Sequence, residues 1–328
     1  FGRANVHSGI GGQGASMLVP TLLEWGSEAQ KQTYIAPTVR GEMMWCQGYS
    51  EPSAGSDLAA LGTQALLDGD NYVINGQKIW TSTAKSAQMM FCLVRTDSEA
   101  KKHLGISYIL IPMDTPGLEV RPLVTMTGHA EFNEVFFTDV TVPASNLVGE
   151  AGQGWQVANS TLKHERGMLG DPDATLKRFN RLVDMLSEET VDAVPLIDNR
   201  LYRDRLMRLQ GQLLKMRFNS LRLLTAGAEK RADALMAQLI VKLNGCELNH
   251  QICALAIDAL EEFGTLYSEG EHLRNTGQWQ WDYMFQLGLI IGGGTAQIQK
   301  NIISERGLSM PREPKAQPRA AGDAGAGT

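Results

Sequence analysis

Hydrophobic and polar positions divide the chain into three regions with different periodicity. Residues 1–40 combine Gly-rich turns with a short helical pattern around Leu18 and Leu22. From 41 to 150, short runs rich in Val, Ile, Thr and Phe alternate with turn residues, which is typical of β-strands. Beyond residue 150 the apolar positions recur with helical spacing. The pattern therefore predicts a β module between two helical regions.

The same pattern predicts individual elements. Strands are expected within 72–74, 90–94, 106–111 and 134–137, and long helices over about 152–187, 199–225, 229–263 and 279–306. Four long antiparallel helices would form a bundle. The predicted fold class is α+β, with the end of an N-terminal helical domain (1–40), a central β-barrel-like domain (41–150), a C-terminal four-helix bundle (151–311) and a flexible tail (312–328).

Composition and charge narrow the functional classes. The chain has 328 residues, of which 43% are hydrophobic and 20% are charged, enough for a sizeable core. A net charge of -6 argues against a nucleic-acid-binding surface, which needs clustered Lys and Arg. The four cysteines, Cys46, Cys92, Cys246 and Cys253, form no CxxC pair, so neither a metal site nor a disulfide framework is expected. With no apolar run of roughly 20 residues, a cytoplasmic location is expected.

Two segments of the β region contain residues that are suited to binding a large ligand. The first, Cys46 to Asp57 (CQGYSEPSAGSD), packs hydroxyls and small residues into one strand-to-loop passage, so that the backbone can approach a large ligand. The second, Asn75 to Ala84 (NGQKIWTSTA), places Trp80 beside Thr81 and Ser82. An aromatic plate next to hydroxyls suits a flat heteroaromatic cofactor. An ordinary β core with a buried Trp and polar turns is the competing interpretation of the same residues.

Four strings resemble the acyl-CoA dehydrogenase family, in the right order. They are YSEPSAGSD (49–57), NGQKIWTS (75–82), NEVFFTDVTVP (133–143) and GTAQIQKNIISER (294–306, preceded by Gly293). The resemblance covers the chain apart from its tail. It implies the acyl-CoA dehydrogenase fold, FAD as cofactor and an acyl-CoA thioester as substrate in lipid metabolism. It also implies that the chain begins inside an N-terminal helical domain, so that an earlier segment is missing.

The resemblance assigns site residues position by position. The expected flavin contacts are Gln47, Tyr49, Ser50, Ser56, Trp80, Thr81, Ser82, Thr295 and Gln297. Ser56, Arg166 and Gly293 are the expected substrate contacts, Gly293 through a backbone N–H that polarises the thioester carbonyl. Simpler interpretations remain open at this point: Ser56 as a turn cap, Gln297 as a solvated helix residue and Arg166 as a structural ion pair.

The reaction needs a base for the α-proton of the thioester. In many relatives this base is a Glu immediately before the Gly-Thr of the last signature, where this chain has Gly293. Glu165, in LKHERG (162–167), matches the position at which branched-chain and long-chain members carry the base instead. Glu165 is therefore the predicted base, and the glycines at 292–294 predict room for a branched or bulky acyl group. A surface carboxylate paired with its neighbour is the alternative for Glu165.

The chain departs from the family pattern at two further places. The family's R-x-x-F-G has no counterpart around VPLIDNRLYRDR (194–205), where Arg200 or Arg203 is a possible substitute. Glu261-Glu262-Phe263 replaces the family's Q-x-F, which predicts repulsion of flavin phosphates. The resemblance implies an electron-transferring flavoprotein as the electron acceptor.

Apolar faces at 232–243 and 253–260 predict a homo- or hetero-oligomer, with core packing as the alternative. A flavin oxidase or monooxygenase and a non-catalytic subunit of a heteromeric dehydrogenase remain open as alternative functions.

Overall fold

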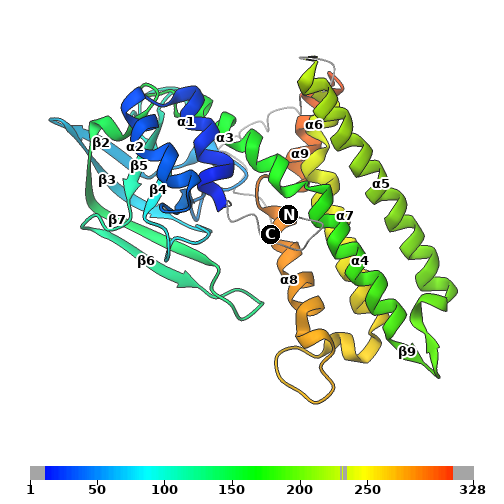
Figure 1. The fold of residues 1–328 in the computed structure, drawn as a ribbon. Coiled ribbons are helices and arrows are strands. Elements are labelled where there is room, and N and C mark those ends of the chain that lie inside the picture. The colour runs from blue at the N-terminus through cyan, green and yellow to red at the C-terminus, as the bar shows by residue number, and fades with distance from the viewer. Residues whose placement is uncertain (1–11, 230, 232–234, 313–328) are drawn as a thin grey trace, which may run out of the picture.

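The computed structural model describes residues 12–229, 231 and 235–312 (Figure 1). Two short helices, α1 (Val19–Trp25) and α2 (Glu28–Val39), precede the strands, as the sequence pattern predicted. A capping box starts α2: the Ser27 side chain accepts from the Gln30 N–H, and the Gln30 side chain accepts from the Ser27 N–H.

The described residues include one mixed sheet of eight strands. Its order is β6-β7-β3-β2-β4-β5-β8, and β1 pairs with β4. The strands are β1 (Trp45–Gly48), β2 (Gln64–Asp68), β3 (Asn71–Lys78), β4 (Met89–Arg95), β5 (Ile106–Pro112), β6 (Leu118–Leu123), β7 (Phe132–Pro143) and β8 (Leu147–Val148). The four strands expected from the sequence fall within β3, β4, β5 and β7.

Strands β4 and β5 are mainly apolar and almost entirely buried, because both faces of the sheet are covered there. All residues of β4 except Arg95 and all of β5 except Pro112 are buried. One face packs Phe91 and Tyr108 against α1, α2 and the first part of α3 (Gly154–Leu169). The opposite face packs against residues of β3 and β7, including Ile74 and Val135.

The remaining long helices form the predicted bundle. They are α4 (Pro172–Glu188), α5 (Arg200–Ala228), α7 (Val241–Ala259) and α8 (Gln278–Ile291), and they stand beside the sheet domain in Figure 1. Their inward residues share one apolar cluster that includes Leu182, Leu209, Ile252 and Trp279. The expected α+β fold class with a C-terminal bundle is confirmed.

Three of the long helices expected from the sequence are interrupted. The stretch 152–187 breaks after Gly170, where a Cβ would lie 2.2 Å from Val241 Cγ1. Asp171 then caps α4, with Pro172 in its first turn. The stretch 279–306 breaks at the glycines 292–294 before α9 (Ala296–Ile302), and 229–263 contains a separate short α6 (Leu235–Leu239). Gly or Pro marks the first two breaks, since both interrupt helical backbone. No Gly or Pro stands at the break between α6 and α7.

Helix α3 connects the two domains. Its first turns bury Val157 and Ala158 against the sheet, and its end packs on α7, where a Cβ on Gly245 would lie 2.8 Å from Gly170 Cα. Glu165, in the last turns of α3, therefore lies between the sheet domain and the bundle. Within the described ranges, no helix is both long enough and apolar enough to cross a membrane.

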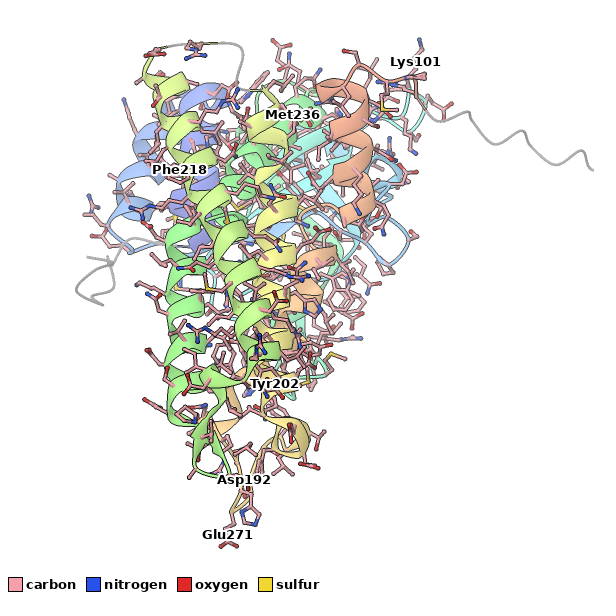
Figure 2. The ribbon with its side chains drawn as sticks, turned by 90° about the vertical axis from the view of Figure 1, so that its right-hand side faces the viewer. Lys101, Asp192, Tyr202, Phe218, Met236 and Glu271 are labelled. Carbon is pink, nitrogen blue, oxygen red and sulfur yellow. The ribbon has the colours of Figure 1, made fainter. Side chains whose placement is uncertain are left out.

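The far end of the bundle carries a small hairpin. Strands β9 (Thr190–Val191) and β10 (Val194–Pro195) pair there. Figure 2 shows Asp192 of this hairpin and Glu271 of the α7–α8 connection at the same end of the bundle. Arg200 and Arg203, the possible substitutes for the absent flavin-diphosphate motif, are exposed in the first turn of α5, close to this hairpin in the sequence.

Candidate functional site

A buried ion pair anchors the loop that follows β1. The Nζ of Lys78 lies 2.7 Å from Glu51 Oε1, and both side chains are almost completely buried. Lys78 also donates to the Tyr49 carbonyl at 3.2 Å. The backbone N–H groups of Gly62 and Thr63 donate to the two Glu51 oxygens. The loop that contains Ser50 and Ser56 is thereby fixed against β3.

The surroundings of Glu51 favour its ionised form. Burial raises the pKa of this carboxyl, but the charge and hydrogen bond of Lys78, with the donors of Gly62 and Thr63, outweigh burial. The pKa of Glu51 is therefore below its ordinary value.

Trp80 follows β3 in a backbone conformation that is unusual for a bulky residue. Its φ is 61°, and its side chain is 54% exposed. The backbone at this point is fixed by Thr81 and Asn133, whose N–H and C=O groups pair in both directions at 3.0 Å. The Phe132 ring meets the indole edge-on, with ring centroids 5.9 Å apart. An exposed indole on such a rigid support is a ready stacking surface.

The indole faces a hollow of about 600 Å³ between the sheet domain and α8. The sheet side contributes Ser50, Gly55, Ser56, Trp80, Phe132 and the segment 123–127, and the helix side contributes Met284, Phe285, Leu287, Gly288 and the segment 291–295. The walls are mainly apolar, and the hydroxyls of Ser50, Ser56 and Thr295 are among their few polar groups. Such a lining suits a ligand with a large flat ring.

A second hollow of about 280 Å³ contains Glu165. Its other lining residues include Gln47, Tyr49, Trp155, Asn159, Gln299 and Arg306. Ser50, Gly55, Ser56, Gly293 and Gly294 line both hollows. The hollow that contains the carboxylate thus adjoins the hollow that contains the indole, and small residues line their border.

Glu165 lies directly against Gly293. A Cβ built on Gly293 would be 3.1 Å from Glu165 Oε1 and 2.8 Å from Leu169 Cδ1. The φ angles of Gly293 and Gly294 are +63° and +88°, which other residues adopt only with strain. Thr295 then caps α9 through a side chain that accepts from the Ile298 N–H at 3.2 Å. A larger residue at 293 would compete with the Glu165 carboxylate for the same space.

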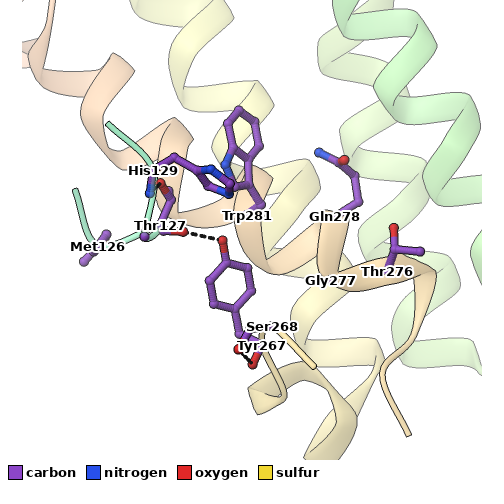
Figure 3. A pocket seen from close by; sticks show the side chains of 10 residues that line it. Met126, Thr127, His129, Tyr267, Ser268, Thr276, Gly277, Gln278 and Trp281 are labelled. Atoms are coloured by element: carbon purple, nitrogen blue, oxygen red, sulfur yellow. Dashed lines mark hydrogen bonds between the residues drawn. The ribbon is translucent and has the colours of Figure 1, made fainter. Parts of the chain in front are cut away.

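A third hollow of about 660 Å³ adjoins the hollow of Trp80 through Met126 and Thr127 (Figure 3). Of the two hollows that share Ser50 and Gly293, that of Trp80 is the larger and that of Glu165 is the smaller. Tyr267, from the α7–α8 connection, donates its hydroxyl to the Thr127 carbonyl at 2.5 Å. His129 and Trp281 also line this hollow (Figure 3). The hydrogen bond from Tyr267 to Thr127 ties the β6–β7 connection to the bundle.

Comparison with known protein families identifies both the sheet domain and the helical bundle. Residues 46–140 match the middle domain of acyl-CoA dehydrogenases, and residues 152–308 match the C-terminal domain of the same enzymes. The chain belongs to the acyl-CoA dehydrogenase family. Acyl-CoA dehydrogenase IpdE1 of Mycobacterium tuberculosis is 40% identical over 318 residues, which is 96% of this chain and 79% of that relative.

Solved structures of acyl-CoA dehydrogenases have the same fold. A protein titled Tcur3481-Tcur3483 steroid ACAD superposes with a TM-score of 0.82 at 29% identity, over 91% of this chain and 76% of that one. The ChsE4-ChsE5 complex of Mycobacterium tuberculosis superposes with a TM-score of 0.81 at 30% identity, over 91% and 77%. The expected enzyme class is confirmed: acyl-CoA dehydrogenases are flavoprotein oxidoreductases that depend on FAD.

The residues of this acyl-CoA dehydrogenase fit a flavin. Gly55 and Gly288 line the larger hollow from opposite sides, and a Cβ at either position would meet no atom within 4 Å. Both glycines therefore leave open space at the walls. Beside Trp80, the buried Thr81 hydroxyl has no hydrogen-bond partner within the described ranges. Open walls, an indole plate and nearby hydroxyls match a planar ring that is hydrogen-bonded at its edge.

The structure brings most of the predicted site residues together. Glu165, Gln47 and Tyr49 line the smaller hollow, Trp80 and Thr295 line the larger, and Ser50, Ser56 and Gly293 line both. Thr81 and Ser82 lie beside the indole but line neither hollow, and Gln297 is exposed on α9 outside both. The side chain of Arg166 lies outside the described residues. The individual roles stay predictions.

Sequence reasoning did not identify several residues of the site. Lys78, Lys242 and Gln299 are buried and bind backbone carbonyls or carboxylates of the site from distant parts of the chain. Lys78 is part of the NGQKIWTS string, and Lys242 is a cation within an otherwise apolar segment, but neither pattern identifies the group that the lysine binds. Glu261, expected to repel flavin phosphates, is exposed, and its Oε1 accepts from the Tyr202 hydroxyl at 3.3 Å.

Proposed function

We propose that this chain catalyses the FAD-dependent α,β-dehydrogenation of an acyl-CoA thioester, with Glu165 as the base. The observation that carries the proposal is the position of Glu165 Oε1. It lies 3.1 Å from the point where a Cβ on residue 293 would be. Position 293 is where many relatives carry the base. A carboxylate that enters the same space from α3 can act on the same α-carbon.

The other residues of the two hollows have complementary tasks. Trp80 offers a stacking surface, and the hydroxyls of Ser50 and Ser56 face the junction between the hollows. FAD, when bound, accepts the hydride that leaves the β-carbon. Glu165 takes the α-proton, and the Gly293 N–H is suited to bind the thioester oxygen as negative charge develops there.

A branched or ring-bearing acyl group fits this site best. The segment 292–294 has no side chains, and the exposed Ile291 and Met126 border the larger hollow as apolar surface. One structural relative is titled a steroid ACAD. In a panel of acyl-CoAs, branched or cyclic thioesters are expected to give the highest kcat/KM. A preference for short straight chains would contradict this assignment.

An external flavoprotein is the proposed electron acceptor, and assembly with further chains is the proposed state. The ChsE4-ChsE5 relative is a complex, and another structural neighbour is titled an electron-transferring flavoprotein, although at 23% identity it shows the fold alone. Anaerobic reduction by substrate followed by an oxygen pulse separates a dehydrogenase from an oxidase. Slow reoxidation by oxygen is expected for the dehydrogenase.

The experiment that tests the function is Glu165→Gln in the flavin-loaded protein. Loss of a general base lowers kcat by about 10²- to 10⁴-fold. The amide is nearly isosteric, so the flavin spectrum and the melting temperature should stay the same. Glu188→Gln is the matched control, because Glu188 is exposed at the end of α4. If Glu165→Gln retains the wild-type rate, Glu165 is not the base. If the purified wild-type protein holds no flavin and Glu165→Gln changes no activity in a complex with a partner chain, the chain is a non-catalytic subunit.

A further inference from the structure

Lys242, on α7, is a buried ammonium that binds only backbone carbonyls. The residue is 1% exposed, and its Nζ donates to the carbonyls of Gly294 at 2.7 Å and Ile290 at 3.2 Å. Within the described ranges, no carboxylate lies within ion-pair distance of this Nζ. Burial lowers the pKa of Lys242, while Cys246, Glu165 and Glu247 act in the opposite direction.

A buried ammonium without an ion-pair partner is costly. Its desolvation costs several kcal/mol, and an apolar side chain of similar length would fill the same space without that cost. Stability alone therefore does not explain a lysine at this position. The role of the positive charge is therefore to be found in the backbone groups that Lys242 binds.

Those groups belong to the glycine turn of the site. Ile290 is at the end of α8, and Gly294 lies just before α9, so Lys242 binds the turn on both sides. Gln299 donates its Nε2 to the Gly293 carbonyl at 3.1 Å. Two carbonyls of the turn and one at the end of α8 are therefore bound by buried side chains. The N–H groups of Gly293 and Gly294 have no acceptor among the described residues.

The same turn supports Glu165. The carboxylate rests against Gly293, whose position depends on the contacts at Gly294 and Ile290. A turn of glycines has high conformational freedom, so these contacts decide its geometry. A displacement of about 1 Å at a reacting group can lower a rate about 100-fold.

We propose that Lys242 is a positioning residue for the dehydrogenation: it holds the Gly292–Gly294 turn so that its free N–H groups face the thioester oxygen and Glu165 keeps its place. The inference rests on the proposed function of this site. Gln299 holds the same turn through its hydrogen bond to the Gly293 carbonyl. Neither residue contacts the reacting atoms in this account.

The test is Lys242→Met in the flavin-loaded protein, with Lys300→Met as the control on the exposed side of α9. The infrared carbonyl stretch of a bound acyl-CoA reports polarisation of the thioester. In the wild type this stretch should lie below its value in water, and in Lys242→Met it should return toward that value. The kcat should fall about 100-fold, with the melting temperature unchanged or higher. Lys300→Met should match the wild type.

Two outcomes separate this inference from the proposed function. Glu165→Gln should lose turnover but keep the carbonyl shift, because the N–H groups remain in place. A wild-type carbonyl shift and kcat in Lys242→Met would overturn the role of Lys242 and leave Glu165 as the base. If Lys242→Met does not fold, Gln299→Met gives the second reading: it should also weaken the carbonyl shift, and an unchanged shift would overturn the inference.

Discussion

At the scale of single residues, the site is built from pairs of groups that are far apart in the sequence. Glu51 and Lys78 fix the loop of Ser50 and Ser56, and Glu165 fills the space left by Gly293. The first pair joins two opposite charges, and the second places a carboxylate against a residue that has no side chain. The chemistry therefore depends on a few contacts that a local spacing pattern does not contain.

The Glu51–Lys78 pair predicts a specific pH dependence of stability. The folded-state pKa of Glu51 is lowered from 4.5, so the pair stabilises the protein above that pH, and the stabilisation is lost as the pH falls through the folded-state value. Glu51→Gln leaves the buried Lys78 without its carboxylate and should cost about 3–5 kcal/mol at pH 7. Urea titrations from pH 7 to pH 3 measure the difference from the wild type, which should narrow below pH 4.5.

The control for this prediction is Glu119→Gln. Glu119 pairs with Arg121 on an exposed part of β6, where water screens the charges. The control should leave the urea midpoint unchanged at every pH. An equal loss in both variants, or a difference for Glu51→Gln that does not depend on pH, would contradict the account of this pair.

Site residues could be predicted from the sequence where they belong to a segment that resembles the family. Glu165, Trp80, Ser50, Ser56 and Gly293 meet around the two adjoining hollows. The placement of Thr81 inside the protein and of Gln297 outside the hollows depends on local geometry that a motif does not encode. Lys242 and Gln299 could not be found, because their partners are backbone carbonyls, which have no sequence signal.

At the scale of elements, helices α3 and α8 enclose the site from the bundle side. The helical pattern located both, but their ends were wrong wherever a glycine or proline interrupted the helix. The break at Gly170 is required by the contact with Val241, and the break at 292–294 forms the turn of the site. Periodicity identifies the helices, whereas close tertiary approach decides where they stop.

Gly288 of α8 offers a test of the larger hollow. A Cβ at this position meets nothing within 4 Å, so Gly288→Ala adds a methyl to the wall and should stabilise α8 by about 1 kcal/mol through helix propensity. The same methyl should weaken flavin or acyl-CoA binding several-fold. Thermal melts of ligand-free protein and binding titrations measure the two effects.

Gly211→Ala is the matched control. Gly211 is also helical and unobstructed, but it lies on α5, away from the hollows. This variant should gain stability without losing affinity. If Gly288→Ala binds both ligands as the wild type does, the larger hollow is not the binding site.

At the scale of the whole molecule, α5 presents an apolar face to its surroundings. Five of its residues are exposed, at spacings that place most of them on one side of the helix: Met207, Leu214, Phe218, Leu221 and Leu224. Figure 2 labels Phe218 on this helix. The segment 253–260, which the sequence suggested for assembly, mostly packs in the bundle core. An apolar stripe of this length is typical of a contact between chains.

The prediction for this face is a change of assembly. Replacing Phe218 and Leu221 together by Glu should lower the molecular mass measured by light scattering after size exclusion. Charges in an apolar contact are desolvated without partners, so the assembly should be lost. Leu66→Glu, on the exposed side of β2, should leave the mass unchanged. A monomeric wild type, or an unchanged mass in the double variant, would contradict the role of α5.

Proton exchange at the α-carbon tests most directly whether Glu165 is the base. A CoA thioester with sulfur in place of its β-carbon cannot give up a hydride, so α-proton removal can be followed alone, as deuterium uptake from D₂O by mass spectrometry. The flavin-loaded wild type and Glu188→Gln are expected to exchange at the same rate, and Glu165→Gln about 10²-fold or more slowly. Exchange by Glu165→Gln at the wild-type rate would contradict the assignment.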